Sequence, residues 1–245
     1  MANQPIYKFY AELDDYIPKI WRRFEVAGNV TVARLGYILM TLFEMQASHL
    51  FAFELQTEEE SDEHAGSRFP YDEAKNIYRF EIPDNESFAL NNDDYVLFDA
   101  TAIKISRVTK TPKVRLNFNY DFGDDWWISQ TLEDVFIDKE LNAKELPRVL
   151  EGSGYGIIED CGGISGLEEL TIAFKKKKGR EYNEFSRWLG VDELDMSAFD
   201  IDDMNFRLKK VPRIYADIYE RNLGPTKQSI DLLERKYLKK EKVRK

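Results

Sequence analysis

The chain is poor in cysteine and histidine: its 245 residues include one cysteine, Cys161, and two histidines, His49 and His64. A single cysteine excludes an intrachain disulfide and is typical of a reducing compartment. The N-terminal residues contain no apolar run behind a basic start, and no stretch has the length of a membrane span. We therefore expect a cytoplasmic protein with neither a secretory signal nor a membrane anchor.

Positive charge is also scarce. Thirty-five Lys and Arg residues stand against 45 Asp and Glu residues, which gives a net charge of −10 and a pI near 4.9. Proteins that bind duplex DNA through overall electrostatics neutralise phosphates with clustered basic residues, so the composition argues against that class. The segment from Thr226 to Lys245 is an exception with a net charge of +5. We expect direct nucleic-acid binding, where it occurs, to use this basic tail only.

The least ordinary stretch is predicted to be a β-hairpin. Apolar and polar residues alternate from Val114 to Tyr120, which is the period-two pattern of a strand with one buried face. Gly123 and the adjacent aspartates favour a turn, and an apolar return run begins at Trp126. The tip of this hairpin would carry three aspartates beside two tryptophans: Asp121, Asp124, Asp125, Trp126 and Trp127.

Two interpretations of the tip stay open. Three carboxylates at one tip repel each other unless water, a cation or a basic partner compensates them. In the first interpretation, Asp121 and Asp124 cap the turn and the tryptophans belong to the core. In the second, the tip is a cation or partner site, and a metal ion would be held by Asp121, Asp124 and Asp125.

The first 136 residues predict a sheet with a packed helix. We expect strands over residues 6–13, 20–26 and 49–55, with a helix behind the N-cap Thr31 between the second and the third. Further strands are expected over 78–82 and 99–105, before the hairpin. The run 58–63 holds five carboxylates in six residues and predicts a solvated loop.

The rest of the chain predicts helices around an irregular loop. We expect a short helix over 141–150, a glycine-rich loop over 152–166, a helix opened by a capping box of Ser165 and Glu168, and later helices at 182–189, 201–208 (N-cap Asp200) and 213–223. The fold class is α+β, with a mixed or antiparallel sheet, a strand-strand-helix-strand start and a helical C-terminal part. We divide the chain into a sheet-and-helix core (1–136), a glycine-rich and helical part of the same domain (137–210) and a helical basic extension (211–245).

Several motifs occur in a recognisable order. They are Ile20-Trp21-Arg22-Arg23, Ser48-His49-Leu50, Tyr120-Asp121-Phe122-Gly123-Asp124-Asp125-Trp126, Glu159-Asp160-Cys161-Gly162-Gly163, and Trp188-Leu189-Gly190 followed by Ala198-Phe199-Asp200. Together they resemble the plasmid pRiA4b ORF-3-like family over most of the chain. The resemblance implies an α+β fold, an association with mobile genetic elements and no established activity.

The chain departs from the family pattern at two positions. Family members commonly carry further histidines two residues after the positions that match His49 and Trp126, where this chain has Phe51 and Ile128. A metal site built from several imidazoles would lose most of its ligands here. We therefore expect no cofactor, and we expect His49 to be a packed or hydrogen-bonded strand residue.

The function that we favour is that of a non-catalytic binding protein. The hairpin tip and the glycine-rich loop would form its recognition surface, with binding residues Asp121, Asp124, Asp125, Trp126, Trp127, Glu159, Asp160 and His49. Exposed carboxylates and aromatic residues suit a protein partner that is basic or binds nucleic acid. The loop lacks the Gly-Lys-Ser/Thr ending of a P-loop, and Glu159 and Asp160 would repel a phosphate.

Two alternatives come from other classes. One is an acidic protein that imitates nucleic acid and inhibits a host enzyme such as a defence nuclease, using the run 58–63, Asp124 with Asp125, and the acidic residues between 192 and 203. The other is a Mg²⁺- or Mn²⁺-dependent phosphodiester hydrolase. The hydrolase requires the hairpin tip and the loop around Glu159 and Asp160 to meet in space. An enzyme that uses Cys161 as its nucleophile is less expected still, because neighbouring carboxylates disfavour its thiolate.

Overall fold

The computed structural model describes residues 4–56, 77–83, 94–109 and 112–233. The strands are β1 (Ile6–Leu13), β2 (Trp21–Ala27), β3 (Phe51–Gln56), β4 (Ile77–Glu81), β5 (Val96–Asp99), β6 (Arg115–Tyr120), β7 (Trp126–Phe136) and β8 (Arg148–Ser153). The helices are α1 (Val32–Leu42), α2 (Ile105–Val108), α3 (Gly163–Lys176), α4 (Arg180–Leu189), α5 (Ile201–Leu208), α6 (Val211–Arg221) and α7 (Lys227–Leu233), with a 3₁₀ turn at Ala143–Glu145.

All eight described strands belong to one sheet in the order β5-β4-β3-β6-β7-β1-β2-β8. Neighbouring strands are antiparallel except β4 and β5, which run parallel, so the sheet is mixed. The predicted α+β class is confirmed. The predicted hairpin is present as β6 and β7, with Tyr120 paired to Trp126 beside the turn.

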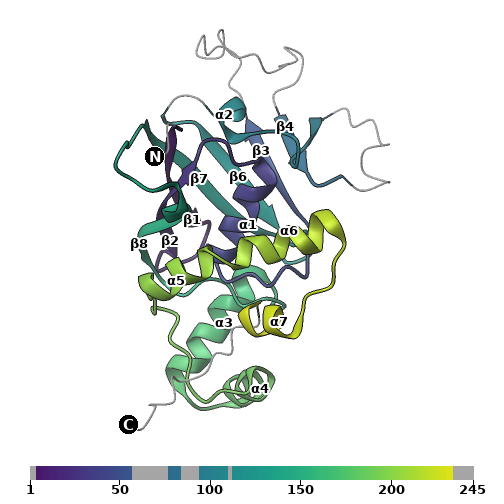
Figure 1. Cartoon of the computed structure of the whole chain (residues 1–245). Helices are drawn as coiled ribbons and strands as arrows, with labels where there is room; N and C mark the ends of the chain where they lie inside the picture. Colours follow the sequence, from purple (N-terminus) through teal and green to yellow (C-terminus); the bar gives the residue numbers. More distant parts are fainter. Residues whose placement is uncertain (1–3, 57–76, 84–93, 110–111, 234–245) are drawn as a thin grey trace.

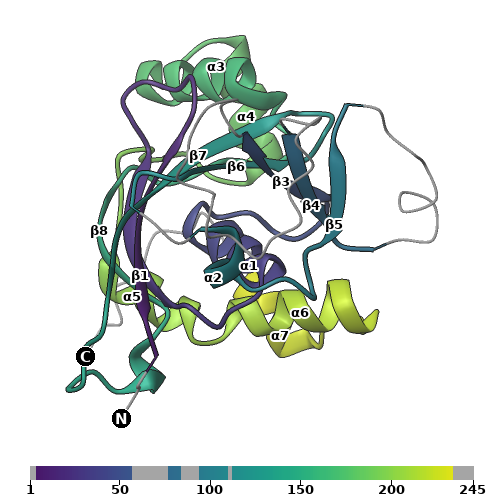
Figure 2. The ribbon, with the colours of Figure 1, turned by 90° about the horizontal axis from the view of Figure 1, so that it is seen from above.

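Helix α1 occupies the hollow of the curved sheet (Figure 2). Every residue of α1 except Arg34 is buried, because the sheet covers one side of the helix while α5 and α6 cover the other (Figure 1). Thr31 is its N-cap as predicted, and its hydroxyl accepts a hydrogen bond from the backbone N–H of Arg34. The molecule therefore has three layers, namely the sheet, α1 and the C-terminal helices.

Several local predictions are wrong. Residues 141–150 do not form a helix but a 3₁₀ turn followed by edge strand β8. Helix α3 begins at Gly163, so Ser165 lies inside it instead of capping it. The segment expected as a strand over 99–105 is a turn that leads into the short helix α2. His49 precedes strand β3, which starts two residues later.

The outer side of edge strand β8 makes a contact that is distant in sequence. The side-chain amide of Asn205 in α5 accepts a hydrogen bond from the backbone N–H of Val149 (2.9 Å) and donates one to its carbonyl oxygen (3.1 Å). One side chain thereby satisfies two backbone groups that another strand would otherwise pair with.

The domain boundaries stay predictions. Val211, Tyr215 and Leu233, which belong to the expected extension, are buried in the same hydrophobic core as the sheet. The acidic run 58–63, His64 and residues 234–245 of the basic tail lie outside the described residues. None of the described helices has both the length and the apolar character needed to cross a membrane.

Candidate functional site

Three separate segments meet at one end of the sheet: the loop between α1 and β3, the β6–β7 turn, and the glycine-rich loop before α3. The backbone N–H of Gly162 donates a hydrogen bond to Asp124 Oδ2 at 3.2 Å. A Cβ at Gly163, where φ is +68°, would stand 2.5 Å from the carbonyl oxygen of Asp124. Only glycine permits so close a contact in this left-handed conformation, so Gly163 lets the loop dock onto the turn.

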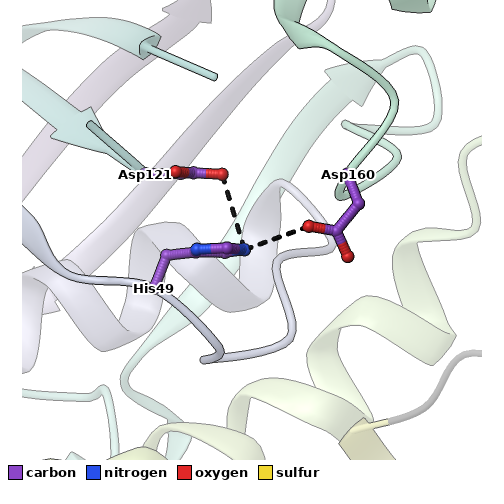
Figure 3. Close-up of side chains that lie close together, drawn as sticks. All are labelled: His49, Asp121 and Asp160. Carbon is purple, nitrogen blue, oxygen red and sulfur yellow. Dashed lines mark ion pairs between the residues drawn. The ribbon is translucent and has the colours of Figure 1, made fainter. Parts of the chain in front are cut away.

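The imidazole of His49 lies between two carboxylates from the other two segments (Figure 3). His49 Nε2 is 3.4 Å from Asp121 Oδ2 and 3.3 Å from Asp160 Oδ1. This nitrogen is shielded from solvent and has no hydrogen-bond partner in the described part of the chain. Asp160 is 69% exposed, whereas the side chain of Asp121 is 12% exposed, so the cluster opens to solvent on the Asp160 side.

Both aspartates hold an unusual backbone conformation. Asp121 has φ +55° and Asp160 has φ +60°. Aspartate adopts the left-handed region more readily than most residues, at an energetic cost. The backbone therefore directs two carboxylates toward one imidazole at positions where a regular strand would not place them.

The buried carboxylate of Glu159 connects the segments that carry this cluster. Glu159 is 6% exposed and accepts hydrogen bonds from the hydroxyl of Ser48 (2.6 Å), the backbone N–H of Gln46 (2.7 Å) and the hydroxyl of Tyr120. Its two side-chain partners and Glu159 itself precede the three cluster residues in sequence: Ser48 precedes His49, Tyr120 precedes Asp121, and Glu159 precedes Asp160. One carboxylate thus links all three segments that carry the cluster.

Other predicted site residues have local roles. Asp124 accepts from Gly162, and Asp125 Oδ1 accepts from the Asn119 side chain at 2.8 Å. Trp126 is fully buried in the core, whereas Trp127 is half-buried. The first interpretation of the hairpin tip holds for Asp121, whose Oδ1 accepts a hydrogen bond from the backbone N–H of Gly123 within the turn at 3.1 Å, and for Trp126, which is a core residue. The second interpretation, a cation or partner site, stays a prediction.

The expected metal ligands Asp121, Asp124 and Asp125 do not converge on one point. Among the described residues, the group of potential ligand atoms that does converge is His49, Asp121 and Asp160, whose atoms lie within 4.8 Å of one another. Glu159 was also expected at the binding surface, but its buried oxygens are occupied by three donors. A sequence cannot show which face of a tight turn each carboxylate will occupy.

Two potential nucleophiles near the cluster have raised pKa values. Burial, with smaller contributions from Asp124 and Asp160, raises the pKa of the Cys161 thiol to about 12. Burial and the adjacent Glu159 raise the pKa of the Tyr120 hydroxyl far above its usual range. Both groups are protonated at neutral pH, so neither supplies an anionic nucleophile.

Arg22 is a supporting residue whose role sequence reasoning missed. Its guanidinium is fully buried and donates five hydrogen bonds to carbonyl oxygens, those of Trp21, Leu42, Ser153, Gly154 and Tyr155. It also lies 4.2 Å from the ring centre of Phe199. Arg22 thereby fixes the start of the glycine-rich loop, and an arginine among inward-facing residues of a predicted strand was the available signal.

Comparison with known proteins identifies relatives but no activity. The chain is 26% identical over 194 residues to the uncharacterized protein y4hQ of Sinorhizobium fredii (strain NBRC 101917 / NGR234), an alignment that covers 79% of this chain and 85% of that protein. Its fold is similar to the crystal structure of MM3350, a protein of unknown function from Methanosarcina mazei Go1, with a TM-score of 0.62 and 22% sequence identity. This match covers 82% of this chain and 98% of that one. The model of the plasmid pRiA4b ORF-3-like protein family matches residues 5–206, and the chain belongs to this family.

Proposed function

We propose that this chain is a non-catalytic binding protein, and that its partner surface is the junction of the β6–β7 turn, the glycine-rich loop and residues 49–50. The observation that carries the proposal is the exposure of two apolar side chains beside the carboxylates. Phe122, next to Asp121, is 46% exposed, and Leu50, next to His49, is 58% exposed. Together they line a small hollow of about 30 Å³ with Phe51, Glu81, Ile82 and Tyr219.

Such a surface suits a protein partner. Apolar side chains gain free energy when a partner removes them from water, and aromatic residues are common among the residues that dominate binding energy. The neighbouring carboxylates of Asp121, Asp124 and Asp160, in a chain of net charge −10, favour a basic partner and faster association at low salt. Glu159 and Arg22 contribute indirectly, since they hold the loop in place.

The test is affinity capture from host cytosol at two salt concentrations, with and without nuclease. The double variant Leu50→Ser with Phe122→Ser should lose a captured protein that the wild type retains, by about tenfold or more, because two exposed anchors are removed. A matched control is Ile137→Ser, which replaces a side chain that is equally exposed (58%) but follows the far end of β7. Ile137→Ser should capture the same protein as the wild type.

The proposal fails if the double variant and the wild type capture the same proteins in equal amounts. Enrichment of nucleic acid that disappears with nuclease, without a surface-dependent protein, would also contradict it. That second outcome would direct attention to the basic tail, which was the expected route for nucleic acid.

The second candidate function is the divalent-cation-dependent phosphodiester hydrolase. The meeting of the turn and the glycine-rich loop favours it, because this contact was its structural requirement. Its expected ligands are the five carboxylates of the tip and the loop, and four of them accept hydrogen bonds from other groups of the protein: Asp121, Asp124, Asp125 and Glu159. That leaves Asp160 and the second oxygen of Asp121, both of which lie beside His49. Hydrolysis of a model phosphodiester in the presence of Mg²⁺ or Mn²⁺, abolished by Asp160→Asn, would establish this function over the binding one.

The nucleic-acid mimic stays a prediction. Its main feature, the run 58–63, lies outside the described residues. In the second acidic cluster, Asp195 accepts hydrogen bonds from Ser197, and the side chain of Asp200, the N-cap of α5, accepts one from the backbone N–H of Asp203. Two carboxylates of this cluster therefore have local structural roles, and no observation on the described residues favours the mimic over the binding protein.

A further inference from the structure

We propose that His49, Asp121 and Asp160 form a binding site for a divalent transition-metal ion of the zinc class. The site lies within the partner surface of the proposed function, but binding of the ion requires no partner. Each ligand comes from a different segment, so a bound ion would join the loop after α1, the β6–β7 turn and the glycine-rich loop (Figure 3).

The distances fit coordination better than direct ion pairing. Charge-assisted hydrogen bonds between nitrogen and a carboxylate are usually about 2.7–2.9 Å long, whereas His49 Nε2 lies 3.4 and 3.3 Å from its two carboxylate oxygens. Two ligands bonded to one tetrahedral zinc ion at about 2.0–2.2 Å stand about 3.3–3.6 Å apart. The nitrogen also has no hydrogen-bond partner among the described residues, and an ion would complete its bonding.

The ligand types select the kind of ion. Mg²⁺ and Ca²⁺ prefer oxygen ligands only, whereas an imidazole nitrogen together with carboxylates suits Zn²⁺ and its first-row neighbours. Two carboxylates and a neutral imidazole balance the charge of a divalent ion. Three protein ligands leave a fourth position open, and the 69% exposure of Asp160 places that opening toward solvent.

Hydrogen bonds hold the backbone and the neighbours of the ligand residues, and Asp121 Oδ1 accepts one from the backbone N–H of Gly123 at 3.1 Å. Glu159 holds the residue before each of the other two ligands, and the hydroxyl of Tyr219 in α6 donates a hydrogen bond to the carbonyl oxygen of His49. These contacts fix the segments that carry the ligands, and the hydrogen bond from Gly123 to Asp121 is an outer contact of the kind that orients a metal ligand. The ligands are therefore arranged by the fold and not by chance proximity of flexible surface chains.

The experiment is calorimetric titration of the purified full-length chain, after treatment with a chelator, with ZnCl₂ and separately with MgCl₂. We expect one zinc ion per chain and weaker or undetectable binding of magnesium. His49→Gln and Asp160→Asn should each weaken zinc binding by about 10- to 100-fold or more. Asparagine also tolerates a left-handed backbone, so Asp160→Asn removes the charge with little change to the loop, and this exposed position keeps the test valid if His49→Gln fails to fold.

A matched control exists because the chain has only one other imidazole. His64→Gln should bind zinc like the wild type. The proposal is overturned if the wild type binds no zinc, if Asp160→Asn and folded His49→Gln bind it unchanged, or if the loss occurs in His64→Gln instead.

The outcomes separate this proposal from the proposed function. Zinc binding is measured on the isolated chain, whereas partner capture is measured with Leu50→Ser and Phe122→Ser, which keep all three ligands. Loss of capture without zinc binding refutes only the metal site. Zinc binding with capture unaffected by the apolar substitutions refutes only the partner surface.

Discussion

Gly163 is in contact with Asp124: an ideal Cβ at this glycine would lie 2.5 Å from the carbonyl oxygen of the aspartate. The contact joins the first residue of α3 to the β6–β7 turn, which are 39 residues apart. It brings Asp160 and Asp121 to the same ring nitrogen of His49. The cluster therefore depends on one close approach of two backbones.

Gly163→Ala should separate the loop from the turn. The added methyl group meets a backbone oxygen and must also adopt φ +68°, so we expect a loss of about 2–3 kcal/mol or more in the free energy of unfolding. Gly190→Ala is the matched control, since Gly190 has φ +69° and a Cβ added there would have no heavy atom within 4 Å. It should cost only about 1–2 kcal/mol. Urea unfolding measures both, and equal losses would contradict the role of the contact.

Glu159→Ala should be strongly destabilising. It leaves the buried hydroxyl of Tyr120 and the backbone N–H of Gln46 without their acceptor, and such losses cost about 1–3 kcal/mol for each buried group. Glu151→Ala is the control, because that side chain is 59% exposed and pairs with Arg23 near the surface. The control should lose less than about 1 kcal/mol. Chemical denaturation measures the free energy of unfolding of both variants. A small loss for Glu159→Ala would show that the hydrogen bonds of Glu159 do not stabilise the fold.

Arg22→Lys should be costly although the charge is kept. A lysine ammonium has three donors and cannot reproduce the planar contacts of a guanidinium that bonds five carbonyl oxygens. We expect a loss of about 2–4 kcal/mol. Arg23→Lys, at a partly exposed ion pair with Glu133, should lose less than about 1 kcal/mol. Thermal unfolding measures the stability loss of both variants. The larger loss of Arg22→Lys should persist at high salt, because salt screens buried contacts much less than exposed ones.

Asp14→Asn should stabilise the protein in a pH-dependent way. Burial raises the pKa of this carboxyl above its ordinary value of 3.8, despite the hydrogen bond from Ser129, so the folded state binds the proton more tightly than the unfolded state does. The wild type thus loses stability as the pH rises through the raised pKa. The variant should have a higher Tm than the wild type at pH 7, and the difference should disappear below pH 3.8. If the difference in Tm between the variant and the wild type stays the same from pH 7 to below pH 3.8, the explanation is refuted.

The sequence predicted those helices and strands for which the spacing of apolar residues and the residues at the ends indicate the same element. The strand expected over 6–13 became β1 with the same bounds, Thr31 caps α1, and the helix expected at 182–189 is the main part of α4. Strand β8 was missed because the signal of an edge strand is weak and its outer groups are satisfied by Asn205, 56 residues away. Ser165 failed as a cap because Gly162 and Gly163 turn the chain into α3 earlier.

The sequence by itself determined the α+β class, the hairpin with its acidic tip, and the family, because these depend on residue order and short-range periodicity. Only the tertiary structure decided which carboxylates lie beside His49. Asp124 and Asp125 flank the same turn as Asp121 but bond to the backbone of Gly162 and the side chain of Asn119. Asp160 and His49, 111 residues apart, reach Asp121 because Gly163 and Glu159 bring their loops together. Contacts across such separations depend on how the layers pack, and no local pattern records that packing.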